Sequence, residues 1–168
     1  VPGEITVSNY HAASTSASLS VTKVLSGRDW TDEDSFTFTL AADSSNPDGA
    51  ALPTTLTGNA TSDSQTVTFD AITFSAAGTY TFTVTETVPE GADENSRYEG
   101  ITYDGTAKTL PAVVEDNGDG TLSVPASEST LSAQVTNTYT VDTTTETVSV
   151  TKVLSGRDWT AEGNFTFT

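Results

Sequence analysis

The segment TYTFTVTE, residues 79–86, places threonine at every odd position and Tyr80, Phe82 and Val84 at the even positions. A period of two is typical of a β-strand with one buried face, because successive side chains point to opposite sides of the backbone. Glu86 follows on the apolar face, where the pattern calls for another hydrophobic residue. The segment therefore predicts a strand that ends in an acid turned toward a protein core.

The same alternation recurs along the chain, and turn sequences such as NPDG (46–49) and NGDG (117–120) separate the alternating runs. β-Branched and aromatic residues in short runs predict an all-β, immunoglobulin-like β-sandwich. We predict strands at 18–25, 35–42, 65–72, 78–88, 107–115, 121–125 and 131–140. The same phase predicts a core of Leu19, Val21, Phe36, Phe38, Leu40, Val67, Phe69, Tyr80, Phe82, Val84, Val135 and Tyr139.

Part of the chain is duplicated. SVTKVLSGRDWT at 20–31 returns unchanged at 149–160, and FTFT follows each copy. Near the start, ITVSNYHA at 5–12 is similar to AQVTNTYT at 133–140. The exact copy is displaced by 129 residues and the similar segment by 128, and matches at nearly the same offset indicate a tandem array of one structural unit.

The offset divides the chain into three parts. Residues 1–15 correspond to the last strand of a preceding repeat with its linker, residues 16–141 to one complete repeat, and residues 142–168 to a linker and the first strands of the next repeat. Neighbouring repeats of the same protein are therefore the expected partners.

Two further polar residues lie on apolar strand faces. Lys23 is in phase with Leu19 and Val21, and Asn137 is in phase with Val135. An unpaired polar group costs several kcal/mol to bury, so such residues must pair with one another or lie at strand ends that water reaches. The second arrangement is the usual one for any single residue.

Repetition favours the first arrangement. The chain has three lysines, and Lys23 and Lys152 are the duplicated pair, whereas Lys108 stands alone. Asn137 also has a counterpart in phase, Asn9. A lysine, an asparagine and an acid on inward faces therefore form one candidate site.

The motifs together resemble the isopeptide-linkage pilin domains of Gram-positive bacterial surface proteins, which occur in major pilins and in adhesin stalks. The resemblance covers the central repeat and rests on VTKVLSGRDW, FTFTL, FSAAGTYTFTVTE, YEGITYD, VVEDNGDGTL and VTNTYT, in that order. In that family a lysine of the first strand and an asparagine of the last form a side-chain amide with the help of a buried acid. The resemblance implies a cross-link between Lys23 and Asn137, with Glu86 as the proton shuttle.

The residue types suit that chemistry. Apolar burial favours a neutral, nucleophilic Lys23 and a protonated Glu86, which we expect to donate a hydrogen bond to the carbonyl oxygen of Asn137. Lys23 would then attack the carboxamide and ammonia would leave. The event occurs once per domain, so we expect no enzyme. Asn9 and Lys152 would each be half of a cross-link whose other half lies in a neighbouring repeat.

The resemblance implies a structural stalk or spacer repeat of an adhesin or a pilus-like fibre, located outside the cell at the cell wall. The alternative is a glycan-binding or host-protein-binding adhesin module, with a site on the loops at 42–50 and 93–100. In the stalk interpretation other domains would contact a host surface ligand.

Composition excludes several other classes. The chain has no cysteine, hence no disulfide or zinc-thiolate site, and its net charge of -17 opposes binding to nucleic acids and anionic membranes. Its one histidine, His11, falls in a linker, which argues against a Ser-His-Asp hydrolase. EDNGDG at 115–120 offers oxygen ligands for Ca²⁺ but is better explained as a hairpin turn. We therefore expect no cofactor and no metal, and any export signal or anchor would lie outside this segment.

Overall fold

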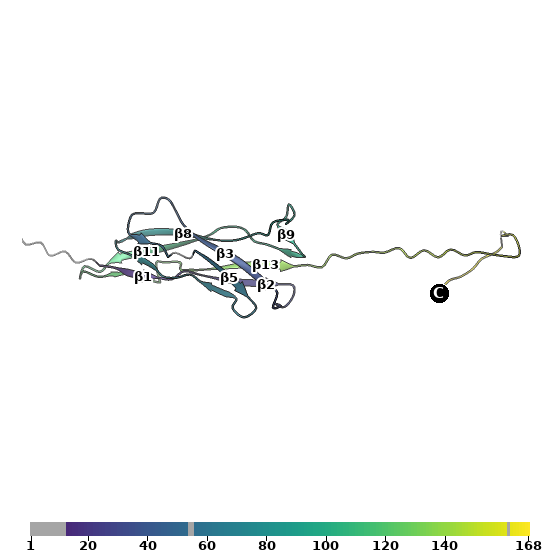
Figure 1. Cartoon of the computed structure of the whole chain (residues 1–168), viewed down its shortest axis with the longest axis horizontal. Helices are drawn as coiled ribbons and strands as arrows, with labels where there is room; N and C mark the ends of the chain where they lie inside the picture. The colour runs from purple at the N-terminus through teal and green to yellow at the C-terminus, as the bar shows by residue number, and fades with distance from the viewer. Residues whose placement is uncertain (1–12, 54–55, 161) are drawn as a thin grey trace, which may run out of the picture.

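The computed structural model describes residues 13–53, 56–160 and 162–168, and the described residues from Thr15 to Tyr139 fold as the predicted all-β sandwich (Figure 1). The strands are β1 (Thr15–Ala17), β2 (Ser20–Ser26), β3 (Ser35–Ala42), β4 (Ala50–Ala51), β5 (Thr57–Thr61), β6 (Thr66–Thr68), β7 (Ile72–Phe74), β8 (Gly78–Glu86), β9 (Arg97–Tyr98), β10 (Ile101–Thr102), β11 (Lys108–Asp116), β12 (Leu122–Ser123) and β13 (Ser132–Tyr139). Two five-stranded sheets enclose the core, and a three-stranded sheet accompanies them.

The topology brings the beginning and the end of the sandwich together. One sheet has the order β6-β2-β13-β10-β9, the second has the order β12-β11-β8-β3-β5, and the small sheet has the order β1-β7-β4. β2 and β13 run parallel, with Lys23 opposite Val135 and Leu25 opposite Asn137. In the second sheet β8 pairs antiparallel with β3, so that Glu86 lies opposite Phe38.

The seven predicted strands occur in the predicted places, with one division. The run at 65–72 is split into β6, which pairs with β2, and β7, which pairs with β1 and β4. The chain changes sheets between them, so a single strand could not continue. The remaining strands escaped prediction because β1, β4, β9 and β10 have only two or three residues, and β5 contains Gly58 and Asn59, which are uncommon in strands.

The predicted core is buried with the exception of Tyr139, which is half-buried. The guanidinium of Arg28 lies 5.1 Å from the centre of the Tyr139 ring, so this face of the ring meets a partly exposed charge and not the core. Leu25 is buried as well. Lys23 therefore lies between two buried apolar neighbours, Val21 and Leu25, in the middle of a strand and not at its end.

The duplicated motif GRDWT forms the loop after β2, and an ion pair holds this loop. Arg28 donates hydrogen bonds of 2.7 and 2.6 Å to the two carboxylate oxygens of Asp34. The main-chain N–H of Thr31 donates to the same carboxylate at 2.7 Å. These partners, Arg28 first, lower the pKa of Asp34 from 3.8 to about 2. Trp30 packs edge-on against Phe36, with ring centres 5.3 Å apart, and so joins the loop to the core.

The Asp34 ion pair predicts a dependence of stability on pH. Asp34→Asn should lower the free energy of unfolding at neutral pH by about 1–2 kcal/mol, since the ionised acid is more strongly bound in the folded chain. Because the folded-state pKa is depressed, this contribution is complete above about pH 4 and is lost as the pH falls toward 2. Urea unfolding of both chains at neutral pH and near pH 2 measures this difference in the free energy of unfolding. The exposed neighbour Asp32 gives the control Asp32→Asn, and an equal loss in both variants would contradict the prediction.

Candidate functional site

The sandwich brings Lys23, Glu86 and Asn137 together in its core. Lys23 and Asn137 lie on the neighbouring strands β2 and β13 of one sheet, whereas Glu86 is the last residue of β8 in the other sheet. Their exposed fractions are 1%, 2% and 0%. Three strands distant in sequence thus bring an amine, a carboxyl group and a carboxamide together in the buried core.

One oxygen contacts both nitrogen atoms of this group. Oε1 of Glu86 lies 2.8 Å from Nζ of Lys23, and it accepts a hydrogen bond of 2.9 Å from Nδ2 of Asn137. The contact between Nζ of Lys23 and Oε1 of Glu86 has the length of an ion pair but not the direction of a good hydrogen bond. Among the described residues, Oε2 of Glu86 has no hydrogen-bond partner. Glu86 therefore stands between the amine and the amide nitrogen.

The carbonyl oxygen of Asn137 has a different partner. The main-chain N–H of Asp104 donates to Oδ1 of Asn137 at 3.0 Å. A main-chain N–H can only donate, so the atom that it meets is the oxygen, and the amide nitrogen must face Glu86. The expectation that Glu86 donates to this oxygen is therefore wrong. Sequence reasoning also missed Asp104, because a main-chain donor leaves no mark in the side-chain pattern.

Aromatic rings surround the amine. Nζ of Lys23 lies 4.7 Å from the ring centre of Phe36 and 6.0 Å from that of Phe38, and Tyr103 packs against Phe36 with ring centres 5.8 Å apart. Removal of water by this burial lowers the pKa of Lys23 and raises the pKa of Glu86, and the attraction between the two groups opposes both shifts. The neutral amine and the neutral acid are both favoured by the surroundings.

These groups have complementary chemical capacities. A neutral amine is a nucleophile, a carboxamide with a hydrogen-bonded oxygen is an electrophile, and a carboxyl group between two nitrogen atoms can carry a proton from one to the other. Transfer of a proton from Lys23 to Glu86 changes no net charge, because it happens inside the pair. The arrangement can therefore support acyl transfer from the amide nitrogen of Asn137 to the amine of Lys23.

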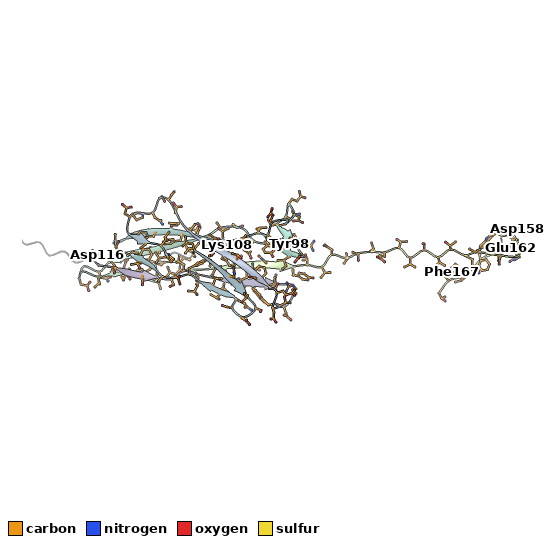
Figure 2. All side chains as sticks on the ribbon, viewed as in Figure 1. Tyr98, Lys108, Asp116, Asp158, Glu162 and Phe167 are labelled. Atoms are coloured by element: carbon orange, nitrogen blue, oxygen red, sulfur yellow. The ribbon has the colours of Figure 1, made fainter. Side chains whose placement is uncertain are left out.

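The other candidate residues lie elsewhere. Asn9 and His11 fall outside the described residues. Lys152 belongs to the extended segment that follows β13, where Figure 2 shows Asp158, Glu162 and Phe167 far from the sandwich. This segment contains no assigned strand among its described residues.

The turn at 115–120 joins β11 to β12. The main-chain N–H of Asn117 donates to the carbonyl oxygen of Thr121 at 3.0 Å, and Asp116 and Asp119 accept hydrogen bonds from main-chain N–H groups of the turn itself. Within the described ranges, no group of three His, Cys, Asp or Glu residues is arranged to hold a metal ion.

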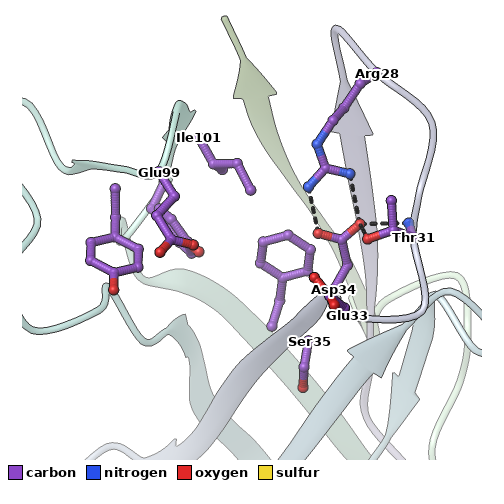
Figure 3. Close-up of a pocket in the computed structure, with 10 residues that line it drawn as sticks. Arg28, Thr31, Glu33, Asp34, Ser35, Glu99 and Ile101 are labelled. Carbon is purple, nitrogen blue, oxygen red and sulfur yellow. Dashed lines mark hydrogen bonds and ion pairs between the residues drawn. The ribbon is translucent and has the colours of Figure 1, made fainter. Parts of the chain in front are cut away.

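A hollow of about 170 Å³ adjoins the site. Its lining includes Phe36, whose ring also contacts Lys23. Arg28 and Asp34 line it as well, and the hydrogen bonds between them are drawn in Figure 3. The charge of Arg28 is already compensated by Asp34, so the hollow offers no free cation to an anionic ligand.

The described part of the chain has no helix long and apolar enough to span a membrane. Comparison with curated proteins finds no match. Among solved structures, the major pilin from Streptococcus pyogenes is similar at 19% identity and a TM-score of 0.43, and a glutamate-to-alanine mutant of it at 18% and 0.44. Both matches cover 74% of this chain and 50% of the pilin, so the chain spans about half the length of these relatives.

The family model of the Spy0128-like isopeptide-containing domain, FctA, matches residues 19–140. The match takes in β2 through β13, and with them Lys23, Glu86 and Asn137. It covers well over half of the chain, and the chain therefore belongs to the family of Spy0128-like isopeptide-containing domains.

Proposed function

We propose that this domain forms an amide bond between Lys23 and Asn137 without an external catalyst, and that the bonded domain serves as a stalk repeat of a surface fibre. The observation that carries the proposal is the position of Glu86, whose one oxygen contacts both the attacking nitrogen and the leaving nitrogen. Membership of an isopeptide-containing family supports it.

The reaction balances within three side chains. Lys23 gives a proton to Glu86 and attacks Cγ of Asn137, so that the new C–N bond forms and negative charge collects on Oδ1. Glu86 then passes a proton to Nδ2 and recovers one from the attacking nitrogen. The bond from Cγ to Nδ2 breaks, ammonia leaves, and Glu86 is again protonated. Folding supplies the proximity that replaces a high concentration of reactants.

The reaction consumes its own groups. Lys23 becomes the nitrogen of an amide and Asn137 loses its leaving group, so neither is regenerated. The domain would therefore act once, during maturation, and would not turn over a substrate.

The strand arrangement makes the bond useful under tension. β2 and β13 lie side by side and run parallel, and the chain leaves β13 at the end of the sandwich away from β1 (Figure 1). Force applied at the two ends would pass along β2 to Lys23, through the amide to Asn137, and out through β13. Residues 24–136 would lie outside the path of the force. They would therefore not unfold under tension, and the stalk would not lengthen.

The start of the following segment is fixed to the sandwich. Arg97 donates hydrogen bonds of 2.8 and 3.0 Å to the carboxylate of Asp142, and it donates to the carbonyl oxygen of Thr140 at 2.8 Å. Arg97 thus ties β9 to the chain just beyond β13. This contact would hold the first residues of a linker in line with β13, which supports a function in an extended array at the cell surface.

The first test is intact mass. The purified chain should be lighter than its sequence by one ammonia, and a tryptic digest should contain a branched peptide that joins Lys23 to Asn137. Lys23→Met should restore the full mass because the nucleophile is gone. The duplication provides a matched control, since the same twelve residues contain Lys152. Lys152→Met should still lose one ammonia, and a full mass for the folded unaltered chain would overturn the proposal.

The second test concerns the acid. Glu86→Gln keeps the shape of the side chain but cannot shuttle a proton, so the chain should fold and keep its full mass. Thermal and urea unfolding should show it less stable by about 5 kcal/mol, because the bond no longer restricts the unfolded chain. The exposed Glu115 provides the control Glu115→Gln, which should react normally. Bond formation at an unchanged rate in Glu86→Gln would show that another group carries the proton.

The third test is extension under force. Cysteines added at the two ends would be the only thiol attachment points, because the chain has none of its own. The Lys23→Met chain should lengthen by about 40 nm when it unfolds, as residues 24–136 are released. The cross-linked chain should show no such step. A step of that length in a chain with the bond verified by mass would refute the proposed path of force.

A further inference from the structure

We propose that the main-chain N–H of Asp104 is the oxyanion donor of the cross-linking reaction, and that the side chains of Asp104 and Lys108 act as positioning groups for it. The inference rests on the proposed function and adds to it a component that the buried triad of Lys23, Glu86 and Asn137 does not contain. It begins from the hydrogen bond of 3.0 Å that this N–H donates to Oδ1 of Asn137.

The sheet delivers this N–H to the site. β10 pairs with β13 through Ile101 opposite Tyr139 and Thr102 opposite Thr138. The ladder then stops, and two residues later the N–H of Asp104 meets the side chain of Asn137 where a continuing ladder would have used a main-chain oxygen. The end of β10 thus frees one main-chain donor beside the carboxamide.

Side-chain contacts hold the turn that carries this donor. The carboxylate of Asp104 accepts hydrogen bonds from the main-chain N–H of Thr106 at 3.1 Å and from Nζ of Lys108 at 2.7 Å. Gly105 lies so close to the chain just after β8 that an added Cβ would be 2.8 Å from Cγ2 of Val88. The hydrogen bonds of the Asp104 side chain and the close packing of Gly105 therefore both restrict the position of the main chain at Asp104.

This donor points to the atom on which charge develops. When Lys23 attacks, the carbonyl bond of Asn137 opens and its electron pair moves to Oδ1, in surroundings from which water is excluded. A donor already in place stabilises that charge without reorganisation, and loss of one such donor typically slows acyl transfer by about 10²–10³-fold. The same hydrogen bond keeps Nδ2 turned toward Glu86, so it sets the direction in which ammonia leaves.

The decisive experiment removes the N–H alone. Cell-free synthesis can place L-lactic acid at position 104, which gives an ester with a methyl side chain, and Asp104→Ala is the amide with the same side chain. The fraction of full-length chain lighter by one ammonia is followed with time. We expect the Asp104→Ala amide to react several-fold more slowly than the unaltered chain, and the ester to react about 100-fold more slowly than that amide.

An ester elsewhere controls for the loss of a hydrogen bond as such. The N–H of Val113 donates to Oγ of Ser129 at 3.0 Å, and Val113 pairs with Thr79 near the start of β8, the end of that strand away from Glu86. The ester made with the hydroxy acid of valine at this position should react at the normal rate. Equal rates for the amide and the ester at position 104, in chains that circular dichroism shows to be folded, would overturn the inference.

A second series applies if the ester chain does not fold. Lys108→Met should slow the reaction several-fold, because the turn loses its anchor, and Lys108→Arg should restore the rate because the guanidinium still reaches the carboxylate of Asp104. Lys108 is exposed enough to be replaced without opening the core, with 29% of its side chain accessible. If Lys108→Met lost ammonia at the unaltered rate, the proposed positioning role of Lys108 would be wrong. Failure of the unaltered chain to lose ammonia would instead overturn the proposed function itself.

Discussion

The contact of one oxygen of Glu86 with Nζ of Lys23 and Nδ2 of Asn137 is the constraint on which the domain depends. Three polar groups without access to water would oppose folding by several kcal/mol if any of them were unpaired. Oε1 of Glu86 compensates part of that cost by contacting both nitrogen atoms, whereas Oε2 has no hydrogen-bond partner among the described residues, and this contact requires two facing sheets to meet in one register. The unreacted domain thus buries an amine and an acid whose charged forms are disfavoured by loss of water, and formation of the amide would replace the amine by a neutral bond.

The parallel pairing of β2 and β13 determines where the proposed bond would carry a load. Lys23 lies opposite Val135, two residues before Asn137, so the long lysine side chain reaches along the strand direction to the carboxamide. A slip by one residue would turn Asn137 away from the core, because alternate side chains point to opposite faces. The apolar alternation that fixes the core, with Val21 and Leu25 on either side of Lys23, therefore also fixes the register of Lys23 and Asn137.

Sequence reasoning predicted the three side chains that meet in the core and missed the main-chain donor beside them. Lys23, Glu86 and Asn137 interrupt an apolar face, and an interrupted period of two is visible in a single sequence. The donor at Asp104 is a peptide N–H, which every residue but proline has, and its position depends on where β10 stops. Strands of two residues such as β10 have no period to detect. The orientation of the Asn137 amide could not be predicted for the same reason, because the main-chain N–H of Asp104 sets it.

The duplicated segment separates what local sequence determines from what the fold determines. Trp159 and Phe165 form an edge-to-face pair with ring centres 5.2 Å apart, like the pair of Trp30 and Phe36, and Nζ of Lys152 lies 4.9 Å from the Phe165 ring. These contacts arise within the segment from Lys152 to Phe165 and need no sandwich. Lys152 is nevertheless exposed, whereas Lys23, in an identical stretch of sequence, is buried. The proposed reactivity of Lys23 would therefore come not from the repeated motif but from the facing sheet and from β13, which bury the lysine and place the acid and the amide beside it.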